Sequence, residues 1–354
     1  MKLLHAADLH LDTPFTGHTP EAAAKLKRAL LQIPSQIVQL AQLHQCDLLL
    51  LSGDLFDGAE SAESLQALKN ALKEVQIPTF ITPGNHDFCT TDSPWLREVW
   101  PDNVHIFTQS HIESIALPHL DCRIYGAGYH SMDCQPLLEG FSATGHERWH
   151  IGVLHGDPVQ KDTPYCPISQ SQLRSCNLDY LALGHIHKAG SVHAGKTLCA
   201  WPGCPMGRGN DETGEKGVLL VTLQETVQTT FLPLDVPRFF DLELEVLSDP
   251  ESAILSALPA AGSEDHYRIT LTGEAEPFDP ASLQFPQFPN LAVRDRTVCP
   301  TDPFAVMGED TLEGLYFKLL HDAMQGQDAQ TIQALQLAAK LSRKILDGQE
   351  VKLP

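Results

Sequence analysis

The sequence predicts an α/β fold, on two observations. Within the first two hundred residues, short apolar runs of strand length alternate with longer stretches of helical periodicity. The order strand, helix, strand recurs along this part of the chain, which is typical of parallel strands buried on both faces. A sequence of 354 residues exceeds what one compact core usually needs, so a smaller second domain is expected as well.

The elements of the first domain follow from these patterns. A helix is expected at 21–44, with Pro34 kinking or dividing it, and a second helix at 62–75. Two strands at 197–200 and 217–223 follow without long helices and are expected to close the domain. Six earlier apolar runs predict strands at 2–7, 47–52, 79–82, 122–125, 150–154 and 180–183.

The pattern of the sequence changes after Pro233 and Pro237. Two segments, FFDLELEVL and HYRITLTGEAE, alternate apolar and polar residues like half-exposed strands, and the stretch between them suits a helix that starts near Asp249. A loop rich in Pro and Phe then precedes LAVRDRTV, another expected strand. These features indicate a small α+β accessory domain.

Residues 310–347 have a helical pattern. Apolar residues recur there at steps of three and four, which gives one apolar stripe on a mostly polar helix. Such a stripe usually packs on its own protein, and the alternative is a docking surface for a partner. The stripe consists of Ala334, Leu337, Ala338, Leu341 and Ile345.

The composition limits the classes of function. The formal net charge of -21 argues against a surface that holds nucleic acid by bulk attraction, so any polyanion must be bound locally. No apolar run is long enough to cross a bilayer and no signal peptide is recognisable, so a cytoplasmic protein without membrane association is expected. The nine cysteines include no C-x-x-C pair and are expected to be reduced and mostly buried.

Five of the expected strands end in polar side chains. Ligands of open α/β sheets bind beyond the carboxyl ends of the strands, so these side chains are expected to converge. Glycines beside them, such as Gly53 and Gly84, allow tight turns and close backbone approach. In chain order the strand ends present Asp8 and His10; Asp54; Asn85, His86 and Asp87; His155; and His185 and His187.

Most of these residues form a candidate metal site. Imidazole, carboxylate and amide ligands without thiolate suit Mn, Fe or Zn. The set is too large for one tetrahedral ion and fits two ions that share a bridge, for which Asp54 is the natural carboxylate. The candidate ligands are Asp8, His10, Asp54, Asn85, His155, His185 and His187.

A site of this kind predicts phosphoester hydrolysis. Two neighbouring cations can share an activated hydroxide and clamp the oxygens of a phosphate ester. The leaving group needs a proton, and His86 is the candidate donor, with Asp87 expected to orient its ring. Glu212 and Glu215 are interpreted as ordinary loop carboxylates, and Lys188 as a solvated lysine rather than a phosphate contact.

The motif set as a whole resembles a known family. The blocks ADLHLD, SGDLFD, PGNHD, LHGD and YLALGHIH, followed by WPGCPMGRGNDETGEKG, are similar to those of the calcineurin-like metallophosphoesterases, and within them to the SbcD and YhaO type of bacterial DNA repair exonuclease. The resemblance implies a four-layer αββα sandwich with two divalent ions, manganese before iron, zinc or magnesium. By position, one ion would be held by Asp8, His10, Asp54 and His187, and the other by Asp54, Asn85, His155 and His185.

The resemblance also implies domains and partners. A catalytic domain is expected at 1–235, an α+β accessory domain that caps DNA at 236–303, and a helical segment at 304–354 that docks a coiled-coil ATPase of the SMC-like type. Double-stranded DNA ends would be the substrate, and a homodimer is expected. Asp57 departs from some relatives, which carry a histidine that helps orient DNA, so strand polarity and the balance between exonuclease and endonuclease action stay open.

Three other functions account for parts of the sequence. A phosphoprotein phosphatase is disfavoured, because GDLFDGA lacks the arginine of the G-D-x-x-D-R-G motif and GNHD replaces GNHE. A phosphodiesterase for cyclic or other small nucleotides would share the same core, although the C-terminal third favours a larger substrate or a partner. A non-catalytic scaffold is disfavoured by the complete ligand set and by His86.

Overall fold

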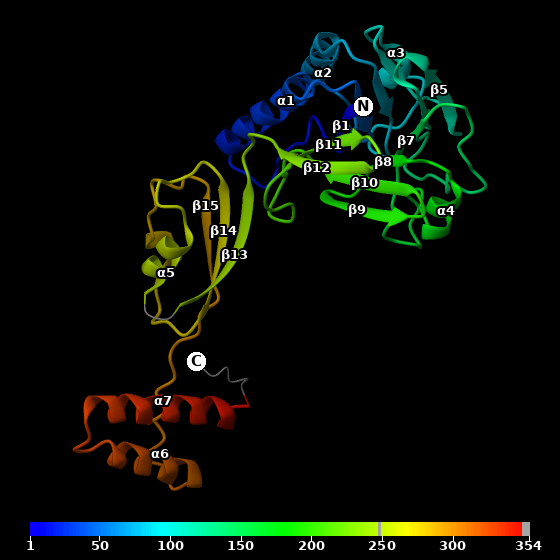
Figure 1. Ribbon diagram of the computed structural model, residues 1–354. Coiled ribbons are helices and arrows are strands. Elements are labelled where there is room, and N and C mark those ends of the chain that lie inside the picture. The colour runs from blue at the N-terminus through cyan, green and yellow to red at the C-terminus, as the bar shows by residue number, and fades with distance from the viewer. Residues whose placement is uncertain (247–248, 349–354) are drawn as a thin grey trace. The chain divides into compact units, whose positions relative to one another are not determined.

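The computed structural model describes residues 1–246 and 249–348 (Figure 1). The last residue of the strand expected at FFDLELEVL and residues 349–354 of the expected docking segment lie outside the described residues. The internal contacts of the chain define two compact units. The first contains Met1–Leu242, Ser263–Arg268 and Pro286–Ala292, and the second contains the intervening segments and the C-terminal region.

One six-stranded sheet of the first unit contains the N-terminal strand. Its strand order is β12-β11-β1-β2-β3-β4, with β1 to β4 parallel. The strand β11 pairs antiparallel with β1, and β12 pairs antiparallel with β11. The strands are β1 (Lys2–Ala6), β2 (Leu48–Ser52), β3 (Thr79–Thr82), β4 (Val104–Ile106), β11 (Gly217–Leu223) and β12 (Val227–Pro233).

The second six-stranded sheet has the order β5-β6-β7-β8-β10-β9. Its central strands β6, β7, β8 and β10 are parallel, whereas β5 and β9 are antiparallel to their neighbours. The strands are β5 (Glu113–Leu117), β6 (Cys122–Gly126), β7 (Trp149–His155), β8 (Tyr180–Gly184), β9 (Lys188–Ala194) and β10 (Thr197–Gly203).

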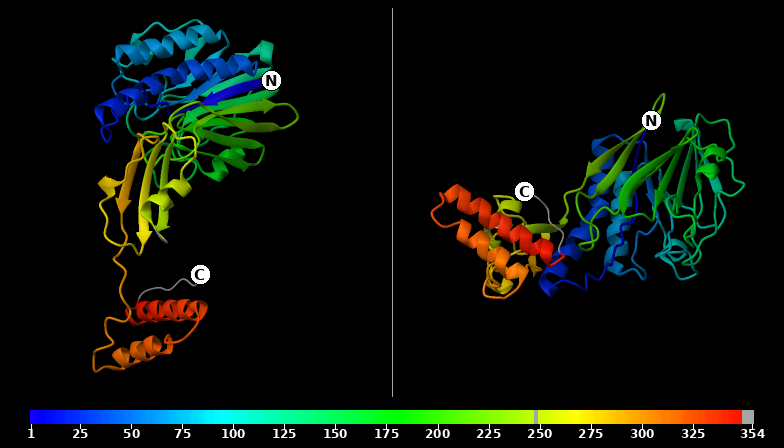
Figure 2. Two further views of the ribbon diagram at one scale, coloured as in Figure 1. Left: turned by 90° about the vertical axis from the view of Figure 1, so that its left-hand side faces the viewer. Right: turned by 90° about the horizontal axis from the view of Figure 1, so that it is seen from below.

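The two sheets pack face to face between helical layers. Successive side chains of a strand point to opposite faces, and in β2 this sends Leu48 and Leu50 into the apolar layer between the sheets. Leu49 and Leu51 enter a different apolar layer, which helices α1 (Pro20–Leu43) and α2 (Ala62–Val75) cover (Figure 2). A third apolar cluster lies on the far face of the second sheet and includes Leu173 of α4 (Gln170–Ser175). The predicted four-layer αββα sandwich is thereby confirmed.

Three of the four α-helices described in the first unit begin at side-chain caps, and α3 (Pro94–Arg97) is the exception. Helix α1 (Pro20–Leu43) starts after Thr19, and α2 (Ala62–Val75) starts after Ser61, whose hydroxyl accepts a hydrogen bond from the Ser64 amide at 3.1 Å. Pro34 does not divide α1, which continues through it. Two short helices, α3 (Pro94–Arg97) and α4 (Gln170–Ser175), complete the set.

The structure contains all eight strands predicted for this unit, each within two residues at its start and three at its end. The four strands that the pattern did not predict are β4, β5, β9 and β12. They form the outer edges of the two sheets, and apart from Ala194 their residues are half-buried or exposed. Edge strands lack the continuous apolar runs from which the central strands were predicted.

A third sheet follows, with the order β13-β14-β15. The helix α5 begins as predicted after Asp249, whose carboxylate accepts a hydrogen bond from the Ser252 amide at 2.7 Å. The C-terminal region forms two helices rather than one, α6 (Leu312–Ala323) and α7 (Ala329–Leu346). The remaining elements are β13 (Phe239–Val246), α5 (Pro250–Ala257), β14 (His266–Gly273) and β15 (Leu291–Asp295).

The apolar stripe predicted on the C-terminal helix is largely accessible. Ala334, Leu337 and Ile345 are exposed, and Ala339 is the buried side chain among the described residues of α7. No described helix is long and apolar enough to span a membrane. All nine cysteines are free, and seven of them are buried.

Candidate metal centre

The predicted ligands gather beyond the carboxyl ends of five strands. β1 leads to Asp8 and β2 to Asp54, and the connecting loops are held together because the Asp8 amide donates to the Gly53 carbonyl at 3.0 Å. The His10 amide donates likewise to the Asp54 carbonyl at 3.0 Å. From the second sheet, His155 is the last residue of β7, and His185 follows β8 directly.

Four of these residues adopt left-handed backbone. The φ angles are 53° at Asp8, 46° at His10, 53° at Asp54 and 101° at His185. Residues with a Cβ rarely adopt these values, and such strain concentrates at functional sites where the surrounding fold imposes it.

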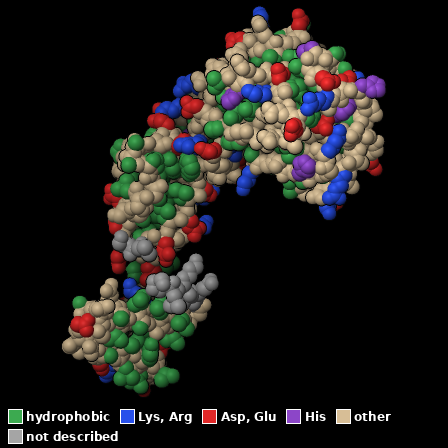
Figure 3. Space-filling model, viewed as in Figure 1, with side chains coloured by type: hydrophobic (Ala, Val, Ile, Leu, Met, Phe, Trp, Pro, Cys, Tyr) green, Lys and Arg blue, Asp and Glu red, His purple; other side chains and the backbone are tan. Residues whose placement is uncertain are grey.

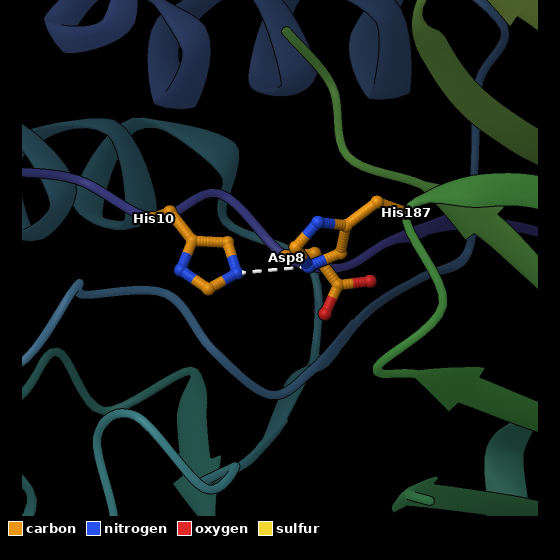
Figure 4. Close-up of side chains that lie close together, drawn as sticks. All are labelled: Asp8, His10 and His187. Carbon is orange, nitrogen blue, oxygen red and sulfur yellow. Dashed lines mark hydrogen bonds between the residues drawn. The ribbon is translucent and has the colours of Figure 1, made fainter. Parts of the chain in front are cut away.

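One half of the site lies around His10 and His187. Their Nε2 atoms are 3.1 Å apart, and both rings turn the same nitrogen toward a common point near Asp8 (Figure 4). Asp8 accepts a hydrogen bond from the His185 amide at 2.8 Å through Oδ1. Ligand atoms of Asp8, His10 and His187 lie within 4.8 Å of one another.

The other half lies around His155. Its Nε2 is 3.0 Å from Asn85 Oδ1 and 3.3 Å from Asp54 Oδ2, and its Nδ1 faces the Ser52 carbonyl at 3.0 Å. His185 Nδ1 lies 3.3 Å from the same Asn85 oxygen. The structure thus brings all seven predicted ligands into one pocket.

Asp54 occupies the centre of the pocket. Its Oδ2 lies 3.3 Å from His155 Nε2 and 3.7 Å from His10 Nε2, while Oδ1 accepts a hydrogen bond from the His86 amide at 2.8 Å. Burial alone would raise the pKa of Asp54, but His155 and His10 lower it. Burial alone would lower the pKa of His155, but Asp54 raises it to about 9. Asp54 and His155 therefore each stabilise the charged form of the other.

The donor set fits divalent metal ions. Among the described residues, Asp8 Oδ2 is one of two buried side-chain polar atoms without a hydrogen-bond partner. An unpartnered carboxylate oxygen away from water is costly, and a cation at this point would remove the cost. Buried imidazole nitrogens and carboxylate oxygens are the ligands that Mn, Fe and Zn prefer.

Two glycines leave no room for side chains behind the ligands. A Cβ at Gly53, where φ is +88°, would lie 2.3 Å from His155 Nδ1. A Cβ at Gly84 would lie 2.2 Å from Asp54 Oδ1. Both positions need glycine because any side chain would push a predicted ligand out of place.

The contacts of His86 differ from the prediction. The carboxylate that contacts its ring is Asp57, at 3.0 Å from Nδ1, rather than the predicted Asp87. The Asp87 carboxylate accepts hydrogen bonds from the backbone amides of Gly84 at 2.7 Å and Leu55 at 2.7 Å. The expectation that Asp87 orients the His86 ring is therefore wrong, because the backbone of two loops occupies that carboxylate.

Asp57 instead contacts two histidines. Besides His86, it lies 3.3 Å from His10 Nδ1, and hydrogen bonds to His10 and His86 lower the pKa of Asp57. The contact with Asp57 raises the pKa of His86. The side chain of His86 is 39% exposed, so the ring is partly accessible from solvent.

Glu212, interpreted from the sequence as an ordinary loop carboxylate, is buried. Its Oε1 lies 2.6 Å from His187 Nδ1, and Arg208 Nη2 donates to the same oxygen at 2.8 Å. Burial alone would raise the pKa of Glu212, but these two contacts lower it. No periodicity in the loop sequence distinguishes Glu212 from the exposed Glu215, so the signal for it exists only in the folded chain.

Comparison with known proteins identifies the family. A family model described as calcineurin-like phosphoesterase matches residues 1–189. The chain belongs to this family. Calcineurin-like phosphoesterases bind two divalent metal ions, in agreement with the clustered His and Asp side chains of the pocket. The chain is accordingly a hydrolase that acts on phosphoester bonds.

The chain is similar to individual relatives with different names, among them a metallophosphoesterase, a nuclease component and a cyclic nucleotide phosphodiesterase. The metallophosphoesterase YhaO of Bacillus subtilis is 35% identical over 234 residues, and the match spans 62% of this chain but only 57% of YhaO. The SbcD component of nuclease SbcCD of Staphylococcus epidermidis is 22% identical over 84% of this chain and 86% of its own length. The 3',5'-cyclic adenosine monophosphate phosphodiesterase CpdA of Haemophilus influenzae is 26% identical over 53% of this chain and 70% of its own length.

Proposed function

We propose that this phosphoesterase is a manganese-dependent DNA phosphodiesterase that acts on double-stranded ends in DNA repair, together with an SMC-like coiled-coil ATPase. The observation that carries the hydrolytic part is the convergence of His10, His187 and His155 around the Asp54 carboxylate. The proposal for DNA is supported by the similarity to the SbcD component of nuclease SbcCD, which extends over most of both chains.

The ligand roles follow the two halves of the pocket. In this proposal, two ions bound there would activate water and neutralise charge on the phosphate. Asp54 would serve both ions, because its Oδ2 lies between a histidine of each half. One ion would be held by Asp8, His10, Asp54 and His187, and the other by Asp54, Asn85, His155 and His185.

His86 would act on the leaving group. Asp57 holds its Nδ1, which would leave Nε2 to donate a proton to the departing oxygen. The exposure of His86 suits this role, because a proton donor must reach a substrate that comes from outside.

The C-terminal helices support a macromolecular partner. On α6, the exposed side chains Leu312, Leu315, Tyr316 and Leu319 recur at steps of three and four, so they form one apolar face (Figure 3). Large exposed apolar faces on soluble proteins usually bind other proteins. We propose that segment 304–354 docks the ATPase and that the region 236–303 contributes to holding DNA.

A phosphodiesterase for small nucleotides is the second candidate function. The similarity to the cyclic nucleotide phosphodiesterase CpdA supports it. That similarity covers 53% of this chain, whereas the similarity to the SbcD component of nuclease SbcCD covers 84%. The similarity to the nuclease component therefore extends over more of this chain than the similarity to the cyclic nucleotide phosphodiesterase.

The deciding experiment compares substrates under one condition. The purified chain is loaded with Mn²⁺ and given end-labelled duplex DNA, single-stranded DNA, cyclic AMP and bis(p-nitrophenyl) phosphate. We expect shortening of the labelled duplex, with a loss of roughly 100-fold or more in His86→Ala. His146→Ala, which changes an exposed histidine away from the pocket, is the matched control.

The outcomes separate the candidates. Progressive shortening from one end supports the nuclease and reports its polarity. Rapid hydrolysis of cyclic AMP with intact DNA would reject the nuclease in favour of the small-nucleotide enzyme.

A further inference from the structure

The loop between β10 and β11 brings a charged pair against the predicted metal centre. Glu212 is 8% exposed although it is a carboxylate, and it contacts His187 from the side opposite the centre. Arg208 donates to Glu212 through its backbone amide at 2.8 Å and through its guanidinium at 2.8 Å. The loop is closed tightly here, because a Cβ at Gly207 would lie 2.5 Å from the Glu212 carbonyl oxygen.

The position of His187 defines which ring nitrogen must be free of a proton. Its Nε2 lies 3.1 Å from His10 Nε2, at the point where both rings face Asp8 (Figure 4). A nitrogen that binds a cation cannot carry a proton, so the proton of a neutral His187 has to be on Nδ1. Nδ1 is the atom that lies 2.6 Å from Glu212 Oε1, and an ionised carboxylate can only accept.

Arg208 favours the opposite tautomer. Its Nη2 lies 2.8 Å from His187 Nδ1, and a guanidinium can only donate. Nδ1 can accept this hydrogen bond only when it carries no proton. The proton of a neutral His187 is then on Nε2, and Nε2 cannot bind a cation. Glu212 and Arg208 therefore compete for the same ring nitrogen, and the shorter contact belongs to Glu212.

We propose that Glu212 is a positioning residue for the metal centre. It holds the Nδ1 proton of His187 and at the same time binds the Arg208 guanidinium, so that Nε2 of His187 stays available for a divalent ion. The inference rests on the proposed role of His187 as a metal ligand. Asp57 occupies the equivalent position behind His10, because its carboxylate lies 3.3 Å from His10 Nδ1. Carboxylates behind ligating histidines commonly fix the tautomer and strengthen metal binding.

The test measures metal binding directly. Metal-free wild type, Glu212→Ala, Glu212→Gln and the double variant Glu212→Ala/Arg208→Ala are titrated with Mn²⁺, and free Mn²⁺ is followed by electron paramagnetic resonance. Hydrolysis of bis(p-nitrophenyl) phosphate is the second readout, and circular dichroism checks the fold. Glu215→Gln is the matched control, because Glu215 is an exposed glutamate three residues along the same loop.

We expect Glu212→Ala to lose about 10- to 100-fold in affinity for one of the two ions, and Glu215→Gln to bind like wild type. The double variant should regain part of the loss, because nothing then donates a proton to Nδ1. A role in packing alone predicts the reverse, since the double variant removes more side-chain volume.

The inference is overturned if Glu212→Ala and Glu212→Gln bind both ions like wild type, or if the double variant binds more weakly than Glu212→Ala. Should the alanine variant fail to fold, Glu212→Gln with and without Arg208→Ala is compared in the same way. Wild type that binds Mn²⁺ but leaves DNA intact would reject the nuclease alone. Wild type that binds no Mn²⁺ would reject both proposals.

Discussion

At the scale of single residues, Asp57 links two histidines with different tasks. It contacts His10, a predicted metal ligand, and His86, the predicted proton donor, through their Nδ1 atoms. A change at Asp57 therefore reaches the binding of metal and the protonation of the leaving group together.

Replacing Asp57 by Asn keeps the shape of the side chain and removes its charge. We expect kcat for bis(p-nitrophenyl) phosphate to fall about 10- to 100-fold, because both rings lose the carboxylate that orients them. The melting temperature should stay close to that of wild type. Asp162→Asn, at an exposed loop position, is the control, and an unchanged kcat in Asp57→Asn would refute this role.

Replacing Asp87 by Ala should act on stability. The carboxylate accepts backbone hydrogen bonds from Gly84 and Leu55, so its loss leaves buried amides without partners. We expect the free energy of unfolding to fall by about 1–3 kcal/mol, measured by urea denaturation in the presence of a chelator. A variant with normal stability but no activity would instead support a direct role of Asp87 in catalysis.

The sequence was sufficient to predict the candidate metal ligands, but not the carboxylates that contact the ligand histidines. Asp8, Asp54 and His155 follow apolar runs that end at one edge of the sandwich, so their convergence could be predicted from strand order. Asp57 and Glu212 contact histidines that lie at least 25 positions away along the chain. No local pattern records those contacts.

At the scale of elements, the turn after β2 in the first sheet lies directly against His155 of the second sheet. Gly53 and Gly58 both have left-handed backbone, with φ of +88° and +86°. Around Gly58 there is open space, whereas a Cβ at Gly53 would meet His155. The two positions therefore separate backbone strain from steric conflict.

Gly53→Ala should weaken Mn²⁺ binding at least tenfold, because the added methyl group displaces the His155 ring. Gly58→Ala carries the same backbone strain, about 1 kcal/mol, and should bind Mn²⁺ normally. Mn²⁺ titration and thermal denaturation of both variants check this. Equal metal affinity in the two variants would show that the close approach at Gly53 is not required.

An aromatic stack makes the first unit sensitive to acid. His266, at the start of β14, stacks on Phe239 at 4.6 Å and lies 5.1 Å from His18. Burial and the neighbouring His18 lower the pKa of His266 to about 4. The unfolded chain takes up a proton near pH 6.5 while the folded chain does not, so stability falls as the pH drops from about 6.5 to about 4.

His266→Phe should reduce this acid sensitivity. The ring stays large enough to stack, and the proton uptake of the unfolded chain at this position disappears. We expect the stability lost between pH 7 and pH 5 to shrink by on the order of 1 kcal/mol in metal-free protein, measured by denaturation at both pH values. An identical pH dependence in wild type and variant would contradict the assignment.

The central strands were predictable and the edge strands were not. Runs such as 48–51 are apolar at every position because both faces of β2 are covered, and that pattern is visible in the sequence. β9 and β12 have one exposed edge and mixed side chains, so only their pairing with β10 and β11 makes them strands. The break between α6 and α7 was also missed, because the apolar periodicity continues on both sides of it.

At the scale of the whole molecule, the net charge limits the affinity of the chain for DNA. A net charge of -21 opposes the long-range attraction of a polyanion. We expect the chain alone to bind a fluorescent duplex with a dissociation constant of roughly micromolar or weaker at physiological salt, and more weakly as salt rises. Anisotropy titrations at several salt concentrations measure this, and tight binding that resists salt would contradict it.

The packing of β2 limits which insertions and deletions this protein can tolerate during evolution. Four successive leucines of this strand fill two separate apolar layers, and the strand leads the chain to Asp54. A deletion or insertion of one residue within the strand would exchange the inward and outward leucines and move the Asp54 carboxylate away from His10 and His155. Sequence drift can therefore alter side chains in this segment, but its length is fixed by packing and by chemistry at once.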